Sequence, residues 1–161
     1  MTTKSPPEIT VFEIADWFLA RAKSEDKPLR HMKLQKLIYF AYGWYCAYYD
    51  GAPLFAEEIY AWQRGAVVKV LYEKYRVCGD NPIIAENLVC PDLDENVTEI
   101  LESVWKSYFP LTDFLLGKAI RRHPAWRKSQ RAFVGWDAVM LPETIRESFK
   151  EMARVYENVH T

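Results

Sequence analysis

The chain has 161 residues, carries 21 Lys and Arg against 22 Asp and Glu, and has a formal net charge of −1. Half of its residues are hydrophobic, 15% are aromatic and only 6 are Gly. This length suits one domain, and the hydrophobic content excludes a disordered chain. The chain has no excess of basic residues, which argues against a protein that coats nucleic acid without sequence specificity. The scarcity of Gly argues against phosphate-binding loops.

Cysteine usage and hydropathy predict a soluble, cytoplasmic protein with reduced thiols. The three cysteines, Cys46, Cys78 and Cys90, cannot all pair, and their spacing matches no paired zinc pattern. The polar N-terminus, 1–7, lacks the apolar core of a signal peptide. The most apolar stretch, 37–49, is shorter than the ~20 residues that a membrane span requires.

Two helices are predicted in the first third of the chain. Thr10 and Glu13 have the spacing of a capping box, in which each side chain satisfies a free N–H at the start of a helix. Apolar residues then recur at the three- and four-residue steps of a helix. A second helix is predicted over 30–49, where Asp50-Gly51 supplies a left-handed stop.

The second helix is predicted to lie at the centre of the fold. In its early turns, Leu34 and Leu37 are expected to face inward while Lys33 and Lys36 face outward. From Leu37 onward nearly every position is apolar, and such a helix is normally surrounded by other elements. Its dense aromatic residues serve the core, a partner surface or both. They are Tyr39, Phe40, Tyr42, Trp44, Tyr45, Tyr48 and Tyr49.

A short extended element is predicted after the central helix. Residues 57–63 favour a strand and partly alternate, and Arg64-Gly65 then breaks the pattern. A third helix is predicted over 67–78, with Gly79 at its end, and 81–91 is predicted to be a loop.

Three further helices complete the chain. Asp92 or Asp94 is predicted to cap the fourth, Thr112 caps the fifth, and Pro142 opens the last, since Pro suits the first position of a helix. The predicted fold is mainly α: a compact single-domain bundle of about six helices around a buried central helix, with one short β-strand or hairpin.

The sequence contains no motif for catalysis, a cofactor or a metal. It lacks a glycine-rich phosphate loop, a His-Glu-x-x-His metal motif and a Gly-x-Ser-x-Gly elbow. The adjacent Glu57 and Glu58 would point to opposite faces of a strand, so they form no acid–base pair. A site built from Cys78 and a histidine stays open as a third hypothesis, because such partners meet only in the fold. We predict no enzymatic activity, no cofactor and no metal.

Charged residues are segregated along the chain. Residues 77–105 contain no Lys or Arg, and 114–136 contain no Asp or Glu. These stretches either solvate the surface, neutralise each other between packed helices, or bind a partner. Since Arg and Trp concentrate binding energy at interfaces, the third possibility points to Arg121, Arg122 and Trp126. DNA and an acidic protein surface would suit this basic stretch equally.

A second set of partner contacts is predicted in the extended element. Tyr60, Trp62 and Arg64 are large side chains beside the flexible Gly65. We expect them to be exposed there and to contact a partner.

The run KLQKLIYFAYGWY, residues 33–45, resembles the hallmark KLQKLLYFAQGWY of the Panacea antitoxin family, the SocA-like domain. Looser matches extend the resemblance over about 11–149. In the segment that resembles the family's His…Pro-Trp motif, Trp126 aligns, whereas an ungapped match places the His on Arg121 rather than on His123. The motif core comprises Lys33, Leu34, Gln35, Lys36, Leu37, Tyr39, Phe40 and Trp44.

This resemblance implies a cytoplasmic bacterial or phage antitoxin that binds a cognate protein toxin. For the adaptor type, it also implies a protease such as a Clp-type machine. The alternative is a DNA-binding regulator of its own operon, supported only by the basic stretch; no membrane partner is expected. We expect one domain over 1–161, with 1–9 and 158–161 as flexible ends.

Overall fold

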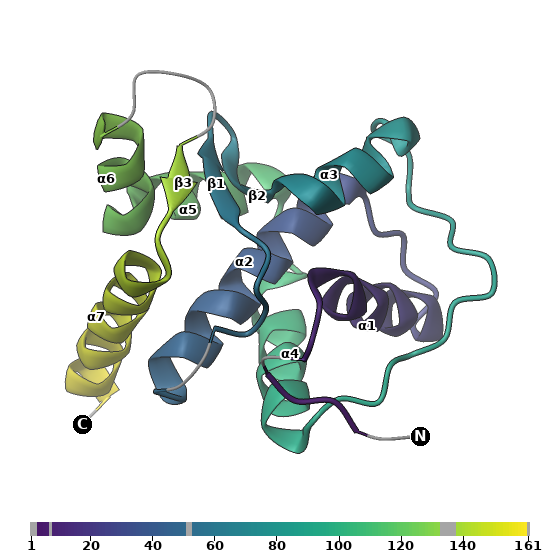
Figure 1. Cartoon of the computed structure of the whole chain (residues 1–161), viewed down its shortest axis with the longest axis horizontal. Helices are drawn as coiled ribbons and strands as arrows, with labels where there is room; N and C mark the ends of the chain where they lie inside the picture. The colour runs from purple at the N-terminus through teal and green to yellow at the C-terminus, as the bar shows by residue number, and fades with distance from the viewer. Residues whose placement is uncertain (1–2, 7, 51–52, 133–137, 161) are drawn as a thin grey trace.

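The computed structural model of the chain describes residues 3–6, 8–50, 53–132 and 138–160. Within these ranges it contains seven α-helices and one three-stranded antiparallel sheet (Figure 1). Helix α2 (His31–Tyr48) runs through the middle and contacts α1, α3, α4, α5, α7 and the sheet. The predicted mainly helical fold around a buried central helix is therefore confirmed.

Helix α1 (Val11–Ser24) begins at the predicted capping box. The Thr10 hydroxyl accepts a hydrogen bond from the Glu13 N–H at 3.3 Å, and the Glu13 carboxylate accepts one from the Thr10 N–H at 3.0 Å. The N-terminal segment before α1 also contacts the fold, because the Lys4 N–H donates to the Asp92 carbonyl at 2.9 Å. The flexibility expected of 1–9 stays a prediction.

The centre of α2 packs directly against α7 (Pro142–His160). A Cβ atom at Gly43 would lie 2.1–2.3 Å from three ring carbons of Phe149, so a side chain at this position would prevent the close approach. The left-handed stop expected at Gly51 lies outside the described residues.

The extended element is a β-hairpin. Strands β1 (Ile59–Trp62) and β2 (Gly65–Val68) pair antiparallel, with Trp62 opposite Gly65. Strand β3 (Val139–Met140) pairs with the other edge of β1, which gives the order β2-β1-β3. Gly65 has a φ of +141°, a conformation that favours glycine, and this permits the tight turn between the strands.

The third helix is shorter than the predicted range 67–78. Its first two predicted residues lie in β2, so α3 (Lys69–Tyr75) begins two residues later. A 3-10 turn (Arg76–Cys78) follows and ends at Gly79, whose φ is +57°. A short apolar run suits a strand or a helix equally well, and the pairing with β1 decides between them here.

The predicted caps of the next two helices are confirmed. Helix α4 (Glu95–Tyr108) follows Asp94, and α5 (Asp113–Arg122) follows Thr112. Each cap side chain accepts a hydrogen bond from a backbone N–H of the first turn, at 3.0 and 3.2 Å.

Helix α6 (Pro124–Ala132) is an additional element that the sequence pattern did not predict. One residue, His123, separates it from α5, and its backbone is extended, with φ −66° and ψ 135°. The residue before a proline is restricted to this region, so the helix must end and restart here. The last helix begins at Pro142, as predicted. Among the described helices, none combines the length and apolar character that crossing a bilayer requires.

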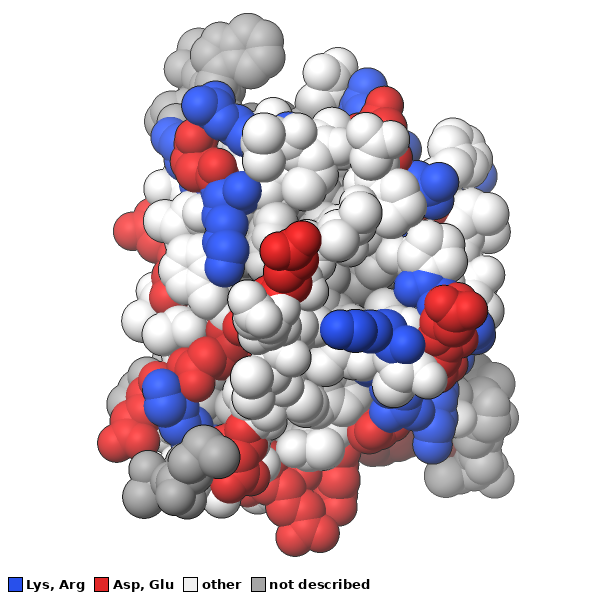
Figure 2. Space-filling view, turned by 90° about the vertical axis from the view of Figure 1, so that its right-hand side faces the viewer, with Lys and Arg blue, Asp and Glu red and all other residues white. Residues whose placement is uncertain are grey.

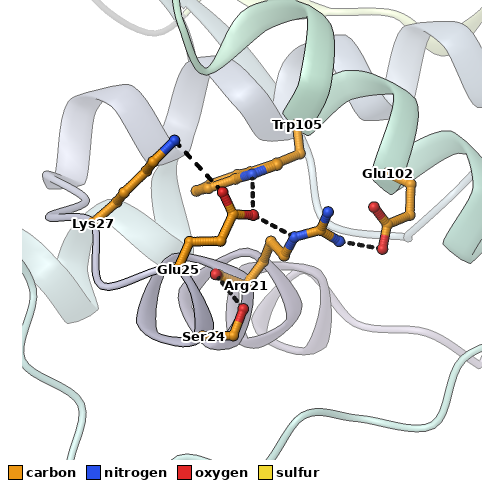
Figure 3. A network of polar contacts seen from close by, with 6 residues as sticks. All are labelled: Arg21, Ser24, Glu25, Lys27, Glu102 and Trp105. Atoms are coloured by element: carbon orange, nitrogen blue, oxygen red, sulfur yellow. Dashed lines mark hydrogen bonds and ion pairs between the residues drawn. The ribbon is translucent and has the colours of Figure 1, made fainter.

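A polar network joins the end of α1 to α4 (Figure 3). Arg21 pairs with Glu25 at 2.6 Å and with Glu102 of α4. The Trp105 indole donates to the same Glu25 carboxylate at 2.8 Å, and Lys27 lies 3.5 Å from its second oxygen. One carboxylate of the acidic stretch is therefore neutralised by α1. In the described part of the chain, no ion pair joins that stretch to the basic one.

Candidate functional site

The two sets of predicted contact residues converge on the hairpin. The Trp126 indole on α6 donates to the Trp62 carbonyl on β1 at 2.9 Å. The Arg121 guanidinium on α5 donates to the Arg64 carbonyl in the hairpin turn at 3.3 Å. Arg122 is exposed in the last position of α5. These five residues form one surface, which we call the hairpin face.

A glycine permits α5 to approach the hairpin turn. A Cβ atom at Gly117 would lie 3.0 Å from the Arg64 carbonyl oxygen and 3.1 Å from the Arg121 Nη1 atom. The same point lies 3.5 Å from the Cε atom of Lys36 on α2. The Lys36 side chain, the Arg121 guanidinium and the Arg64 backbone carbonyl therefore meet around Gly117.

Lys36 does not face outward, so that prediction is wrong. Its exposed fraction is 5%, because α5 and the hairpin cover this part of α2. Burial is the main cause that lowers the pKa of the Lys36 ammonium group. The negative charge of Asp113 opposes this shift, whereas the positive charges of Arg121 and Arg64 add to it.

The predicted exposed aromatic residues of β1 are half-buried. The Trp62 ring packs edge-on against Tyr72, with centroids 4.9 Å apart. Its indole Nε1 is buried and has no hydrogen-bond partner among the described residues. The Tyr60 hydroxyl donates to the Glu58 carboxylate at 3.3 Å, and the Tyr60 ring lies 5.6 Å from the Lys69 ammonium. The Tyr60 and Trp62 rings therefore each contact a residue of α3.

Gln35 fixes the hairpin to the central helix. Its side-chain carbonyl accepts from the Val68 N–H at 2.9 Å, and its amide nitrogen donates to the Val68 carbonyl at 3.2 Å. The same amide nitrogen lies 3.1 Å from Nε2 of His31, so this ring nitrogen is the acceptor. Burial lowers the pKa of His31, which is consistent with a neutral ring.

Tyr39 fixes the junction between α5 and α6. Its hydroxyl lies 3.0 Å from Nδ1 of His123, and both side chains are buried. Burial lowers the pKa of His123 to about 4, so its ring is uncharged at neutral pH and the contact is a hydrogen bond between two neutral groups. The order His123-Pro124 before Trp126 was the signal that could have identified this buried residue.

The comparison with known families decides the assignment. Residues 34–127 match the family model described as antitoxin SocA-like, Panacea domain, which is more than half of the chain. The chain belongs to the SocA-like Panacea family. Antitoxin SocA of Caulobacter vibrioides is 29% identical over 113 residues, which cover 63% of this chain and 60% of that relative. The chain thus spans less than two thirds of this relative's length. No solved structure matches the chain.

The Panacea match includes every residue of the hairpin face, together with Lys36 and Gly117. It also includes most of the predicted motif core, whose described contacts hold α2 in place. The Trp44 indole donates to the Tyr108 hydroxyl at 2.9 Å. Lys33, just before the matched range, donates to the Leu111 carbonyl at 2.7 Å. The remaining apolar members are buried: Leu34, Leu37 and Phe40.

A second surface feature was missed by the sequence reasoning. A groove of about 350 Å³ lies between α1 and the loop that follows α3, lined by Leu19, Leu29, Ile83 and Leu88 among others. Figure 2 shows this side of the molecule, where uncharged side chains occupy most of the centre around isolated charged ones, and acidic side chains gather at the lower edge. The nearby Ile84 is 86% exposed.

The described residues contain no group of three or more His, Cys, Asp and Glu side chains that could hold a metal ion. All three cysteines are free, and Cys46 is buried. Burial raises the pKa of the Cys46 thiol to about 11, which disfavours the nucleophilic thiolate.

Proposed function

We propose that this chain is an antitoxin that neutralises a cognate protein toxin by binding it directly through the hairpin face. Membership of the SocA-like Panacea family supports the antitoxin role. The observation that supports the surface is the convergence of Arg121 on Arg64 and of Trp126 on Trp62.

The hairpin face is suited to protein recognition because its backbone is held before any partner arrives. Gln35 fixes the end of β2, and the Trp126 indole fixes the end of β1. Binding to a surface that is already ordered costs less conformational entropy. Arg and Trp are the residue types that dominate binding energy at protein interfaces.

Direct binding accounts for neutralisation without chemistry on the toxin. An adaptor route, in which the chain delivers the toxin to a Clp-type protease, would add a second partner. A host that lacks the protease distinguishes direct binding from the adaptor route. Direct binding predicts that this host is still protected from the toxin, whereas the adaptor route predicts that protection disappears.

The proposal is tested by expressing the product of the neighbouring gene alone and together with this chain. We expect growth arrest by the neighbour alone, restored growth with the chain, and co-purification of the two proteins in one complex. A harmless neighbour, or rescue without a complex, would contradict the proposal.

The same preparation tests the alternative of a DNA-binding regulator. Phosphate contacts impose a steep dependence of affinity on salt concentration. We expect no sequence-specific gel shift with a duplex from the upstream region at any salt concentration. A specific shift with a steep salt dependence would favour the regulator instead.

A further inference from the structure

We propose that Lys36, Arg64 and Arg121 form a receptor site for a single carboxylate side chain of the protein partner. This inference rests on the proposed function, because it names the chemistry with which the hairpin face recognises its toxin. The partner is expected to insert an Asp or Glu side chain at the point where α2, the hairpin turn and α5 meet.

The first observation is a largely buried lysine whose ammonium group forms no ion pair with the described residues. Lys36 is 5% exposed, and among the described residues no hydrogen bond or ion pair joins its ammonium group to another residue. Charged groups that are buried to this extent are normally paired, since an unpaired charge in a poorly solvated position is costly. The missing charge is therefore expected from a ligand.

The second observation is that the Arg121 guanidinium lies close to this lysine, beside the backbone carbonyl of Arg64. Around Gly117, the Arg121 Nη1 atom and the Lys36 Cε atom lie within 3.1 and 3.5 Å of the same point. The Arg121 guanidinium is oriented by the Arg64 carbonyl, a neutral acceptor, so its positive charge is not neutralised by that bond. A guanidinium presents a planar fork of donors that matches the two oxygens of a carboxylate.

The third observation is the local excess of positive charge. Arg121, Arg64 and Lys33 all act on Lys36 as like charges, and within the described part of the chain only Asp113 opposes them. An incoming carboxylate would relieve this repulsion. Its attraction is strengthened by the partial exclusion of water at a buried position.

The depth of the site favours an acidic side chain over a nucleic-acid backbone. A duplex is bound through rows of exposed cations that follow its phosphates, whereas Lys36 is almost completely covered. A carboxylate at the end of a flexible side chain is small enough to reach it. The chain's net charge of −1 also gives no general attraction to a duplex.

The test uses Lys36→Met, because methionine is unbranched and similar in length and removes only the charge. We expect its melting temperature to equal or exceed that of the wild type, since the buried charge is unpaired before binding. The toxin for this measurement is the neighbouring gene's product, released from its complex with the wild-type chain and refolded. We expect the affinity of Lys36→Met for this toxin to fall on the order of thirtyfold or more. Arg121→Gln should give a similar loss. Lys106→Met, at an exposed position of α4, is the matched control and should bind as the wild type does.

A Lys36→Met variant that folds and binds the toxin as tightly as the wild type overturns the site but leaves the proposed function intact. Failure of the wild type itself to bind the toxin contradicts the proposed function, and the site falls with it. Loss of binding to an upstream duplex, with unchanged toxin affinity, assigns the cluster to phosphate and also overturns the proposal. The positive counterpart is a screen of toxin variants for restored binding to Arg121→Glu. The site predicts suppressors in which an Asp or Glu of the toxin becomes Lys or Arg.

Discussion

The Trp126 indole and the Trp62 backbone carbonyl form a 2.9 Å hydrogen bond across 64 residues of sequence. This bond holds α6 against β1, and the Gln130 amide also donates to the carbonyl of Ala61 on the same strand. The basic stretch and the hairpin are therefore one structural unit, so a change in α6 should be felt at the hairpin turn.

Trp126→Phe keeps the aromatic bulk of this contact and removes its hydrogen bond. We expect a loss of about 1 kcal/mol in the free energy of unfolding, as for a typical hydrogen bond. We also expect weaker toxin binding, because β1 and the Arg64 turn lose a fixed position. Urea denaturation and a binding titration measure the two effects.

Trp44→Phe is the matched control for this variant. It also removes one indole hydrogen bond of 2.9 Å, to the Tyr108 hydroxyl, but at the α2–α4 contact. Trp44→Phe should lower the free energy of unfolding by a similar amount and leave toxin binding unchanged. Equal effects of the two variants on binding would show that Trp126 acts only through global stability.

Gly43→Ala is expected to destabilise the fold, although Gly→Ala inside a helix ordinarily stabilises by about 0.5–1 kcal/mol. The added Cβ would lie 2.1–2.3 Å from the Phe149 ring, so α2 and α7 must separate. Overpacking of this kind costs about 1–3 kcal/mol. Urea denaturation measures the change.

A double-mutant cycle identifies Phe149 as the cause. Phe149→Leu alone should destabilise the fold. In the Phe149→Leu background, however, Gly43→Ala should lower the free energy of unfolding by less than it does in the wild type. Strictly additive effects would show that the ring of Phe149 is not what excludes a side chain at position 43.

The buried His123 predicts a specific loss of stability in acid. Its pKa is lowered from the ordinary 6.5 to about 4 in the folded protein. As the pH falls below about 6.5, the unfolded chain binds a proton that the folded protein does not, so stability decreases between about pH 6.5 and 4. The full effect amounts to about 3 kcal/mol.

His123→Gln tests this prediction, because glutamine retains a hydrogen-bonding group without titrating in this range. The variant should lose less unfolding free energy than the wild type between neutral pH and pH 4. The unfolding free energy of the variant should still decrease somewhat with falling pH, since burial also lowers the pKa of His31. Parallel pH profiles for wild type and variant would contradict the assigned role of His123.

Local signals in the sequence predicted where α1, α5 and α7 begin. The Thr10–Glu13 box, the Thr112 cap and the Pro142 start act within one turn of the chain, so they are readable without the fold. Contacts across long separations were not readable. The local pattern predicts Val68 to be helical. Its strand conformation is instead set by its pairing with β1 and its hydrogen bonds to Gln35, 33 residues away.

The candidate site shows the same division. Composition alone identified Arg121 and Trp126 as residues of interest, but not that they meet Arg64 and Trp62, which are 57 and 64 residues distant. Helical periodicity predicted an exposed Lys36. Helix α5 and the hairpin cover this lysine, and the local pattern on α2 contains no sign of these distant elements.

The affinity of the toxin for a charge-reversed hairpin face tests the central claim most directly. The variant combines Arg121→Glu with Arg122→Glu, and its control combines Lys23→Glu with Lys106→Glu, at exposed positions on α1 and α4. With both proteins shown to be folded, direct binding through the hairpin face predicts loss of toxin binding in the first and wild-type affinity in the second. Wild-type affinity in both would contradict it.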